Sequence, residues 1–259
     1  LLFCIKKATK IIIPSFIKYI KRDSFSNCLL LQEIEFDEDS QLLIIEENAF
    51  SSIKTLTIPS KVEQLQDDWC SHTLHLTNVI LSSENNKKNY FEKDSEIQTI
   101  EKCAFEKSNL SSLEFPDSLV DLQEGWCFGA ESLYDMIISP KNQRFSFIDN
   151  KMVVKKKDIN GECYDTLVFV SRYVETLKIP SFIKYIDCYA FSSMISLSEI
   201  DFTEDSQLEM ISKYAFCLNI IEKLHIPEKV TYLEDGWCLG AICLSDISIS
   251  PKNKNFKFI

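Results

Sequence analysis

The sequence is short of glycine, with 5 in 259 residues, so the glycine-rich loops that bind phosphates or dinucleotides have little to form from. It contains no apolar run near the ~18 residues that a membrane-spanning helix needs. Signals for the starts and stops of long helices are also missing. Basic residues are in deficit, since the net charge is -11, and this argues against nucleic acid or anionic lipid as a main partner.

The chain is organised by an internal repeat. Residues 13–46 and 179–212 align without a gap at an offset of 166 residues. Inside this long repeat runs a shorter one, apolar-x-x-apolar-x-apolar, whose last two apolar residues would share one face of a short strand. Its ten copies begin at Ala8, Leu31, Ile53, Leu76, Leu110, Leu133, Val174, Leu197, Ile221 and Leu244. Most copies start 22 to 24 residues apart, within the range of leucine-rich repeats.

A second anchor follows most of these strands. It consists of an apolar residue, three variable residues, and then Ala-Phe or Trp-Cys, with one Ser-Phe variant. The last residues of the eight copies are Phe25, Phe50, Cys70, Phe105, Cys127, Phe191, Phe216 and Cys238. The five-residue step predicts a tight turn or one helical turn that returns its side chains to the core.

Units this small cannot bury an apolar face alone, but stacked units can share one core. The sequence therefore predicts an α/β repeat solenoid of the leucine-rich-repeat type, a right-handed superhelix of about ten rungs of about 23 residues each. We expect a parallel inner β-sheet, with short helical or 3-10 turns on the outer side. We expect residues 1–259 to form one solenoid domain. Because the chain begins and ends inside a unit, we interpret it as a fragment in which a targeting segment would not be visible.

Two segments interrupt the period. Residues 82–96, approximately, are polar and predict a solvated insertion loop. Residues 145–171, approximately, contain two apolar runs around Asn160-Gly161, which predicts an inserted β-hairpin that projects from the stack. Lys155, Lys156 and Lys157 make one end of the hairpin basic. That end is either a solvated strand end that resists edge pairing or a docking patch for an acidic partner.

The repeated motifs I-P-S-F-I-K-Y-I, x-A-F and L-x-x-I-x-F cover essentially the whole chain and resemble the BspA-like leucine-rich repeat proteins. Members of that family occur on the surfaces of some oral bacteria and in anaerobic protist parasites. The resemblance implies a solenoid with an inner parallel sheet, a location at the cell surface or outside the cell, and roles in adhesion or in binding host proteins. It carries over no catalytic residue and no particular partner. The Trp-Cys units depart from the family pattern, which should change the core but not the fold.

The ten cysteines raise the question of disulfides. Cys70, Cys127 and Cys238 occupy the position that Phe fills elsewhere, so they are predicted to be core thiols. Cys70 and Cys127 would lie two rungs apart, at about 10 Å, whereas a disulfide needs Cα atoms within about 7 Å. We expect the cysteines to be reduced, although this is unusual for an extracellular protein.

Three minor sites have alternative interpretations. The motif Cys70-x-His72-x-x-His75 could bind a metal or act as a Cys/His nucleophile pair, but the equivalent residues after Cys127 and Cys238 contain no imidazole. We therefore expect no enzyme activity and no cofactor. The acidic turns 37–40 and 203–206 could hold calcium, although bend capping is favoured. Asn109-Leu110-Ser111 matches a glycosylation acceptor that a buried Leu110 would make hard to reach.

The main candidate site is the solvent face of the inner sheet, here called the strand face. Each strand would turn two residues outward, and extended faces of this kind are what solenoids use for binding. These residues are Lys10, Ile12, Glu33, Glu35, Thr55, Thr57, Asn78, Ile80, Ser112, Glu114, Asp135, Ile137, Thr176, Lys178, Glu199, Asp201, Lys223, His225, Asp246 and Ser248.

The sequence thus predicts a non-enzymatic protein-binding solenoid, resembling a surface antigen or adhesin, whose partner could be a host matrix or surface protein. Two alternatives stay open. One is a cytoplasmic structural or scaffold leucine-rich-repeat protein, and the other is a solvated sheet face with no dedicated partner in this fragment. Neither nucleic acid nor membrane insertion is expected.

Overall fold

The computed structural model describes residues 8–26, 28–50, 53–71, 73, 75–81 and 95–256. They fall into two compact units, Leu1–Gln143 (unit 1) and Arg144–Ile259 (unit 2), which are described one at a time. The single domain over residues 1–259 stays a prediction. Most of the expected insertion at 82–96 lies outside the described residues.

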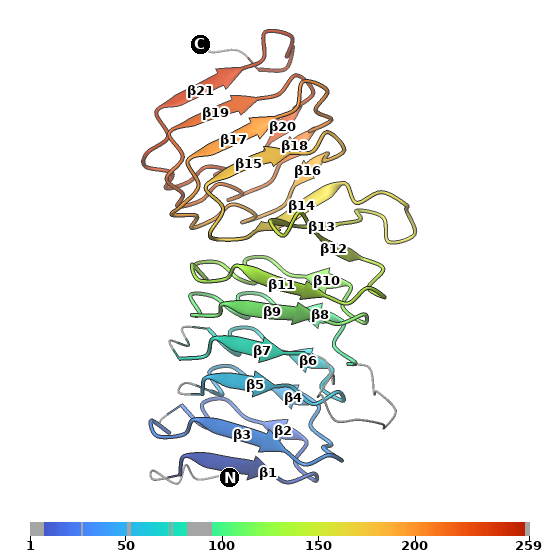
Figure 1. Cartoon of the computed structure of the whole chain (residues 1–259), viewed down its shortest axis with the longest axis vertical. Helices are drawn as coiled ribbons and strands as arrows, with labels where there is room; N and C mark the ends of the chain where they lie inside the picture. The colour runs from blue at the N-terminus through green and yellow to red at the C-terminus, as the bar shows by residue number, and fades with distance from the viewer. Residues whose placement is uncertain are drawn as a thin grey trace. The chain divides into compact units, whose positions relative to one another are not determined.

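The predicted inner strands of unit 1 are parallel and lie one above another in Figure 1, where they form a two-stranded and a four-stranded sheet. The strands are β1 (Lys10–Ile13), β3 (Glu33–Phe36), β5 (Thr55–Thr57), β7 (Asn78–Ile80), β9 (Ser112–Phe115) and β11 (Asp135–Ile138). Hydrogen-bonded neighbours are in strict register, as in Lys10 opposite Glu33 and Met136 opposite Leu113. The middle apolar residue of each repeat lies inside its strand, as predicted, and it is buried in every inner strand of unit 1 except β1, where Ile11 is half-buried.

A second parallel sheet contains the apolar residue that opens each anchor. In unit 1 it consists of β2 (Tyr19–Ile20), β4 (Ile44–Ile45), β6 (Gln64–Leu65), β8 (Thr99–Ile100) and β10 (Asp121–Leu122), in the order β10-β8-β6-β4-β2. None of the described residues forms a helix, so the α/β class and the helical outer turns were wrong. The apolar residue that opens each anchor lies in one of these strands, and its backbone bonds to neighbouring rungs without helical hydrogen bonds. The Ala-Phe or Trp-Cys residues that close the anchor lie in the turn that follows or, at Phe25 and Phe50, in an isolated bridge.

The turn after each anchor explains why no helix forms there. Its first left-handed residue, with φ of 52° to 70°, is Asp23, Asn48, Asp68, Cys103, Gly125, Tyr189, Tyr214 or Gly236. Four residues later a second left-handed residue follows at Lys107, Gly129, Ser193, Leu218 and Gly240, with φ of 50° to 72°. Left-handed backbone interrupts a right-handed helix. The amides bond to the next rung instead, as in Phe105 N–H to Trp126 O at 2.7 Å.

Unit 2 repeats this plan and adds the insertion to its second sheet. Its inner strands are β15 (Thr176–Ile179), β17 (Glu199–Phe202), β19 (Lys223–Ile226) and β21 (Asp246–Ile249). The second sheet has the order β12-β13-β14-β16-β18-β20, with β12 (Phe145–Ile148), β13 (Met152–Lys155), β14 (Thr166–Val170), β16 (Tyr185–Ile186), β18 (Met210–Ile211) and β20 (Tyr232–Leu233).

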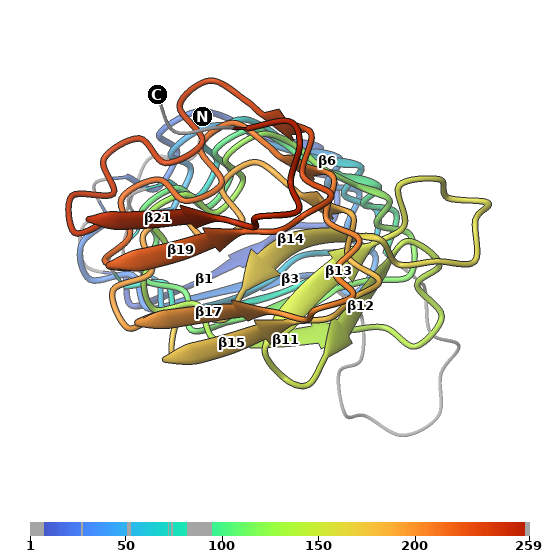
Figure 2. The same ribbon diagram turned by 90° about the horizontal axis from the view of Figure 1, so that it is seen from above.

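The antiparallel pairing of β13 with β14 confirms a hairpin, but it is not a simple projection. Strand β14 pairs in parallel with β16, so it takes the place of a rung in the second sheet. The loop between β13 and β14 extends to the side of the strands, as Figures 1 and 2 show. The apolar residues of β14 are all buried, which is why this insertion is anchored rather than free.

A column of aromatic rings runs through the core of unit 1. Phe25 stacks on Phe50 with ring centroids 5.6 Å apart, and Trp69 meets Phe50 and Phe105 edge-on at 6.4 Å and 5.5 Å. In unit 2, Phe191 stacks on Phe216 at 4.6 Å. In a Trp-Cys rung the large ring comes from the first anchor residue instead of the second. The thiol then fills the smaller space, as Cys70 does at 0% exposure.

Candidate functional site: the strand face

The strand face consists of alternate residues of the inner strands. Buried and exposed residues alternate along the inner strands, as in Glu33–Phe36 and Thr176–Ile179. Register places like positions beside one another, so that Glu35 lies opposite Ile12 and Asp201 opposite Lys178. Thr57, Asn78, Ile80, Ser112 and Glu114 are half-buried rather than exposed, while the other face residues are open to solvent.

The charged groups on the unit 1 face are partly paired with each other. Lys10 Nζ lies 3.2 Å from Glu33 Oε1 and 2.5 Å from Glu35 Oε1. The hydrogen bond to Glu35, with a smaller contribution from Glu33, raises the pKa of Lys10 above its usual value. Further along, Ser112 Oγ donates to Asn78 Oδ1 at 3.0 Å. The face of unit 1 thus runs from a charged cluster on β1 and β3 through uncharged polar groups on β5 and β7 to the acidic Glu114 and Asp135 on β9 and β11.

Unit 2 presents charges of both signs on the same face. Register pairs Thr176 with Glu199, Lys178 with Asp201, and Lys223 with Asp246. His225 Nδ1 lies 2.9 Å from Ser248 Oγ on the next strand. Two isoleucines stand out on the whole face, since Ile12 is 57% and Ile137 54% exposed. Such a mixture of charged, hydroxyl and isolated apolar groups suits recognition of a protein surface.

The basic segment of the insertion is engaged within unit 2. Lys155 forms an ion pair with Asp187 on the rung of β16. Lys157 Nζ lies 3.5 Å from the centre of the Tyr185 ring, and Lys156 Nζ lies 5.3 Å from that of Tyr164. These contacts favour a structural role, holding the insertion against the second sheet, over docking of an acidic partner.

The Cys70/His72/His75 motif does not form a recognisable centre in the described part of the chain. Cys70 is fully buried, and burial raises the pKa of its thiol to about 12 despite a hydrogen-bond contact with Thr73. His75 is exposed, and His72 lies outside the described residues. A neutral buried thiol is a poor nucleophile and a poor metal ligand.

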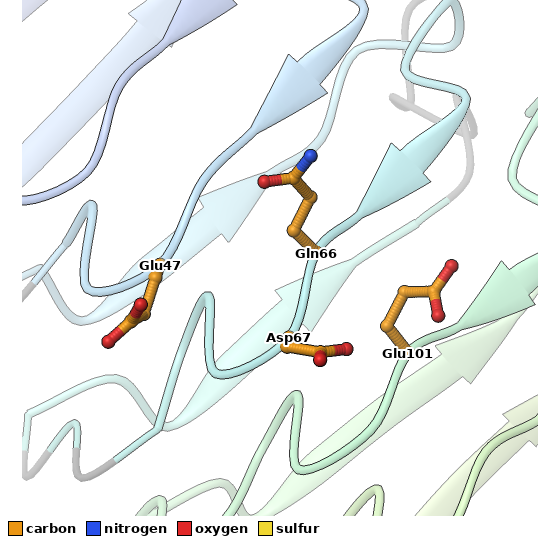
Figure 3. A pocket seen from close by; sticks show the side chains of 4 residues that line it. All are labelled: Glu47, Gln66, Asp67 and Glu101. Carbon is orange, nitrogen blue, oxygen red and sulfur yellow. The ribbon is translucent and has the colours of Figure 1, made fainter.

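Two acidic clusters on unit 1 were missed by sequence reasoning. Asp68, Cys103 and Glu106 have potential ligand atoms within 4.8 Å of one another. Burial is the main cause that raises the pKa of Cys103 to about 12, and the neighbouring Glu106 raises it further. Glu47, Gln66, Asp67 and Glu101 line a cavity of about 340 Å³, shown in Figure 3. Burial is the main cause that raises the pKa of Glu101, and the negative charges of Asp67 and Asp121 add to it. Both clusters join residues of successive rungs, so no local spacing reveals them.

The acidic turns cap bends, which is the interpretation that the sequence favoured. Asp37 Oδ2 accepts a hydrogen bond from the Ser15 amide at 2.9 Å, and Ser40 Oγ accepts one from the Leu42 amide at 3.3 Å. Ser206 does the same for Leu208. At the glycosylation motif, Asn109 is exposed but accepts a hydrogen bond from Ser132 Oγ, and Leu110 is fully buried.

The cysteines depart from expectation at one position, because Cys28 is disulfide-bonded. The other eight described cysteines are outside disulfides, including the predicted core thiols Cys70 and Cys127, which are buried, and Cys238, which is half-buried. Cys163 and Cys243 are exposed.

Thiol labelling tests this arrangement. In native protein at pH 8, iodoacetamide should modify Cys163 and Cys243 within minutes, because they are exposed, while Cys70 stays unmodified, because its pKa of about 12 keeps it protonated and burial keeps it out of reach. Peptide mass spectrometry reads out each position. Labelling in denaturant, where Cys70 should react, is the control, and rapid native labelling of Cys70 would contradict the buried position.

Short parallel strands stacked at a repeat of this length, with a shared apolar core, define a leucine-rich-repeat solenoid. The chain belongs to the BspA type leucine rich repeat family, whose pattern matches residues 2–94, 85–155 and 165–258 in six copies. This confirms the resemblance drawn from the motifs. No curated protein matches the sequence. No described helix is long and apolar enough to cross a membrane.

Solved structures share this fold. The pneumococcal vaccine antigen PcpA has a TM-score of 0.70 at 23% identity, over 94% of this chain and 62% of that one. A leucine-rich repeat protein from Eubacterium ventriosum has a TM-score of 0.69 at 17% identity, over 93% and 60%. A leucine rich cell surface protein from Faecalibacterium prausnitzii has 0.57 at 16%, over 99% and 85%. The chain thus spans less than two thirds of the first two proteins.

Proposed function

We propose that the protein is a non-enzymatic binding solenoid of the surface-antigen type that holds a protein partner on its strand face. The observation that carries the proposal is the register of that face: neighbouring strands bring polar and charged side chains from distant sequence positions side by side. The repeat leaves these positions free to vary, because the side chains take no part in the core. Family membership and the nature of two structural neighbours, a vaccine antigen and a cell surface protein, support a location outside the cell.

The partner class is a host matrix or surface protein. A face with both signs of charge and few apolar groups favours a partner recognised through many polar contacts, with modest affinity per unit area. The net charge of -11 disfavours acidic polymers.

Binding of the chain to immobilised matrix proteins, measured by biolayer interferometry, tests the proposal. Glu199→Lys reverses one exposed charge at the centre of the unit 2 face and should weaken binding about tenfold, as expected for loss of about 1.4 kcal/mol. Glu228→Lys makes the same charge change on an exposed turn off the face and should leave binding within about twofold. Equal losses in both variants, or no binding by the native chain, would count against the strand face.

One observation favours the cytoplasmic scaffold instead. Eight of the described cysteines are outside disulfides, which is more usual in a reducing compartment. Immunolocalisation of the full-length protein on intact and permeabilised cells separates the two functions.

A further inference from the structure

An apolar stripe runs along one corner of unit 2, apart from the strand face. Its residues occupy the same place in each turn, six residues after the first left-handed residue, as Ile195 follows Tyr189. This place is here called the corner position. In unit 2 this position holds Ile195, Ile220 and Ile242 on successive rungs, with exposures of 57%, 40% and 90%. Leu218 and Leu239, which precede it in the same turns, are 50% and 59% exposed. Ile195 and Ile220 stay open to solvent although another rung follows each of them.

The five side chains lie on the turns of three successive rungs. The turns are joined by backbone hydrogen bonds from Ser193 to Cys217 at 2.9 Å and from Leu218 to Leu239 at 3.1 Å. Leu218 also leans over the next rung, because its Cδ2 lies only 2.5 Å from the place that a Cβ on Gly240 would take. The stripe exposes on the order of 500 Å² of apolar surface, the size at which patches on monomers are often functional.

The repeat itself does not require apolar residues here. In unit 1 the corner position holds Leu29, Lys54, Leu74, Asn109 and Glu131, of which the four described residues, all but Leu74, are exposed. Lys107 leans over Gly129 where Leu218 leans over Gly240. The same backbone thus accepts charged side chains in unit 1. The exposure of Ile195 and Ile220, each of which has another rung after it, therefore has a cause outside the fold.

We infer that the corner stripe of unit 2 is a self-association surface, which takes the same stripe of a second copy of this chain. Charge selects this occupant. The segments 192–198, 217–221 and 236–245 contain no charged residue, so two stripes can meet without repulsion. Unit 2 as a whole carries 14 basic and 16 acidic residues, so it is nearly neutral and two copies of it can approach with little repulsion, whereas unit 1 carries 14 and 23.

The stripe also suits a twofold contact. Its middle rung carries Ile220 and is flanked by one apolar rung on each side, so a twofold axis at Ile220 places Ile195 of one copy near Ile242 of the other. A lipid surface is a poorer fit, because segments that bind membranes through an apolar face carry basic residues beside it, and these segments have none.

Sedimentation velocity of the whole chain between about 1 and 200 μM tests the inference, since a patch below the ~800 Å² per partner of a standard interface predicts micromolar dimers. All samples carry Cys163→Ser and Cys243→Ser, which prevents disulfide dimers between exposed thiols. Ile220→Lys should weaken dimerisation at least about tenfold, because it buries an unpaired charge at the centre of the contact. Asn109→Lys, at the corner position of unit 1, should leave the dissociation constant unchanged.

Ile195→Lys provides a second variant should Ile220→Lys unfold, which circular dichroism would show. A native chain that stays monomeric at 200 μM overturns the inference, as do dimers that both lysine variants leave intact. A monomer that floats with phosphatidylcholine vesicles, and stops doing so on Ile220→Lys, would assign the stripe to lipid and likewise overturn it.

Discussion

Replacing Trp69 with alanine is expected to lower the free energy of unfolding by about 3–5 kcal/mol, the range for removing a large aromatic side chain from a core. Trp69 is fully buried and contacts both Phe50 and Phe105 edge-on, so its loss breaks the aromatic column of unit 1 at one rung. Its indole N–H has no hydrogen-bond partner among the described residues, so the expected loss is one of packing.

The second substitution in this experiment is Cys70→Phe. By itself it should also destabilise, by about 1–3 kcal/mol, because the Trp69 ring already occupies the space. Combined with Trp69→Ala it converts the rung to the Ala-Phe form of its neighbours Phe50 and Phe105. The double variant should recover at least half of the loss of Trp69→Ala, with about 1 kcal/mol still missing because Ala-Phe fills less volume than Trp-Cys.

Urea unfolding of the four proteins, followed by circular dichroism, gives the coupling energy. The two substitutions should couple by about 2 kcal/mol or more, as contacting residues that share a cavity do. Additive losses would mean that the Phe introduced at position 70 does not enter the column, and the account of the two rung types would then be wrong.

Replacing Gly240 with alanine is expected to destabilise by about 1–3 kcal/mol, because the residue has φ +72° and its new Cβ would stand 2.5 Å from Leu218 Cδ2. The left-handed backbone supplies the part of the loss that side-chain movement cannot relieve. Leu218 can rotate, so a Leu218→Ala background should recover only the steric part. Thermal unfolding measured by circular dichroism reports both.

The equivalent residue of another rung is the matched control. Ser193 has φ 56°, so Ser193→Gly should be neutral or slightly stabilising, since glycine adopts this backbone without strain. Substitutions of opposite direction at the same structural position should thus have opposite signs. A loss for Ser193→Gly as large as that for Gly240→Ala would show that φ is not the cause.

The strands and the core could be predicted because their signal is periodic. The apolar-x-x-apolar-x-apolar pattern placed Ile34, Leu113 and Leu224 at the centres of buried strands, and the Ala-Phe anchor placed Phe50 and Phe216 inside. The outer turns could not be predicted in the same way. Their conformation depends on left-handed residues as different as Cys103, Tyr189 and Gly125, which share no sequence signature. Hydrogen bonds from the next rung, rather than local preference, stabilise them.

The candidate sites also differ in whether they follow from the repeat pattern or from contacts between rungs. The strand face follows from alternation within each strand, so its residues could be named in advance. The cavity at Glu47, Asp67 and Glu101 and the corner stripe both depend on which side chains lie on adjacent rungs, at separations set by each loop length. The insertion was recognised as a hairpin, but its parallel pairing with β16 needed knowledge of which edge it meets.

The rung-to-rung hydrogen bonds also bear on how such a chain can change over generations. Since each turn bonds to the turns beside it, and the 166-residue offset preserves the pattern from one half to the other, a gene could gain or lose whole turns by unequal recombination and still encode a foldable product. Diversity would then accumulate on the outward side chains while the buried pattern is copied unchanged.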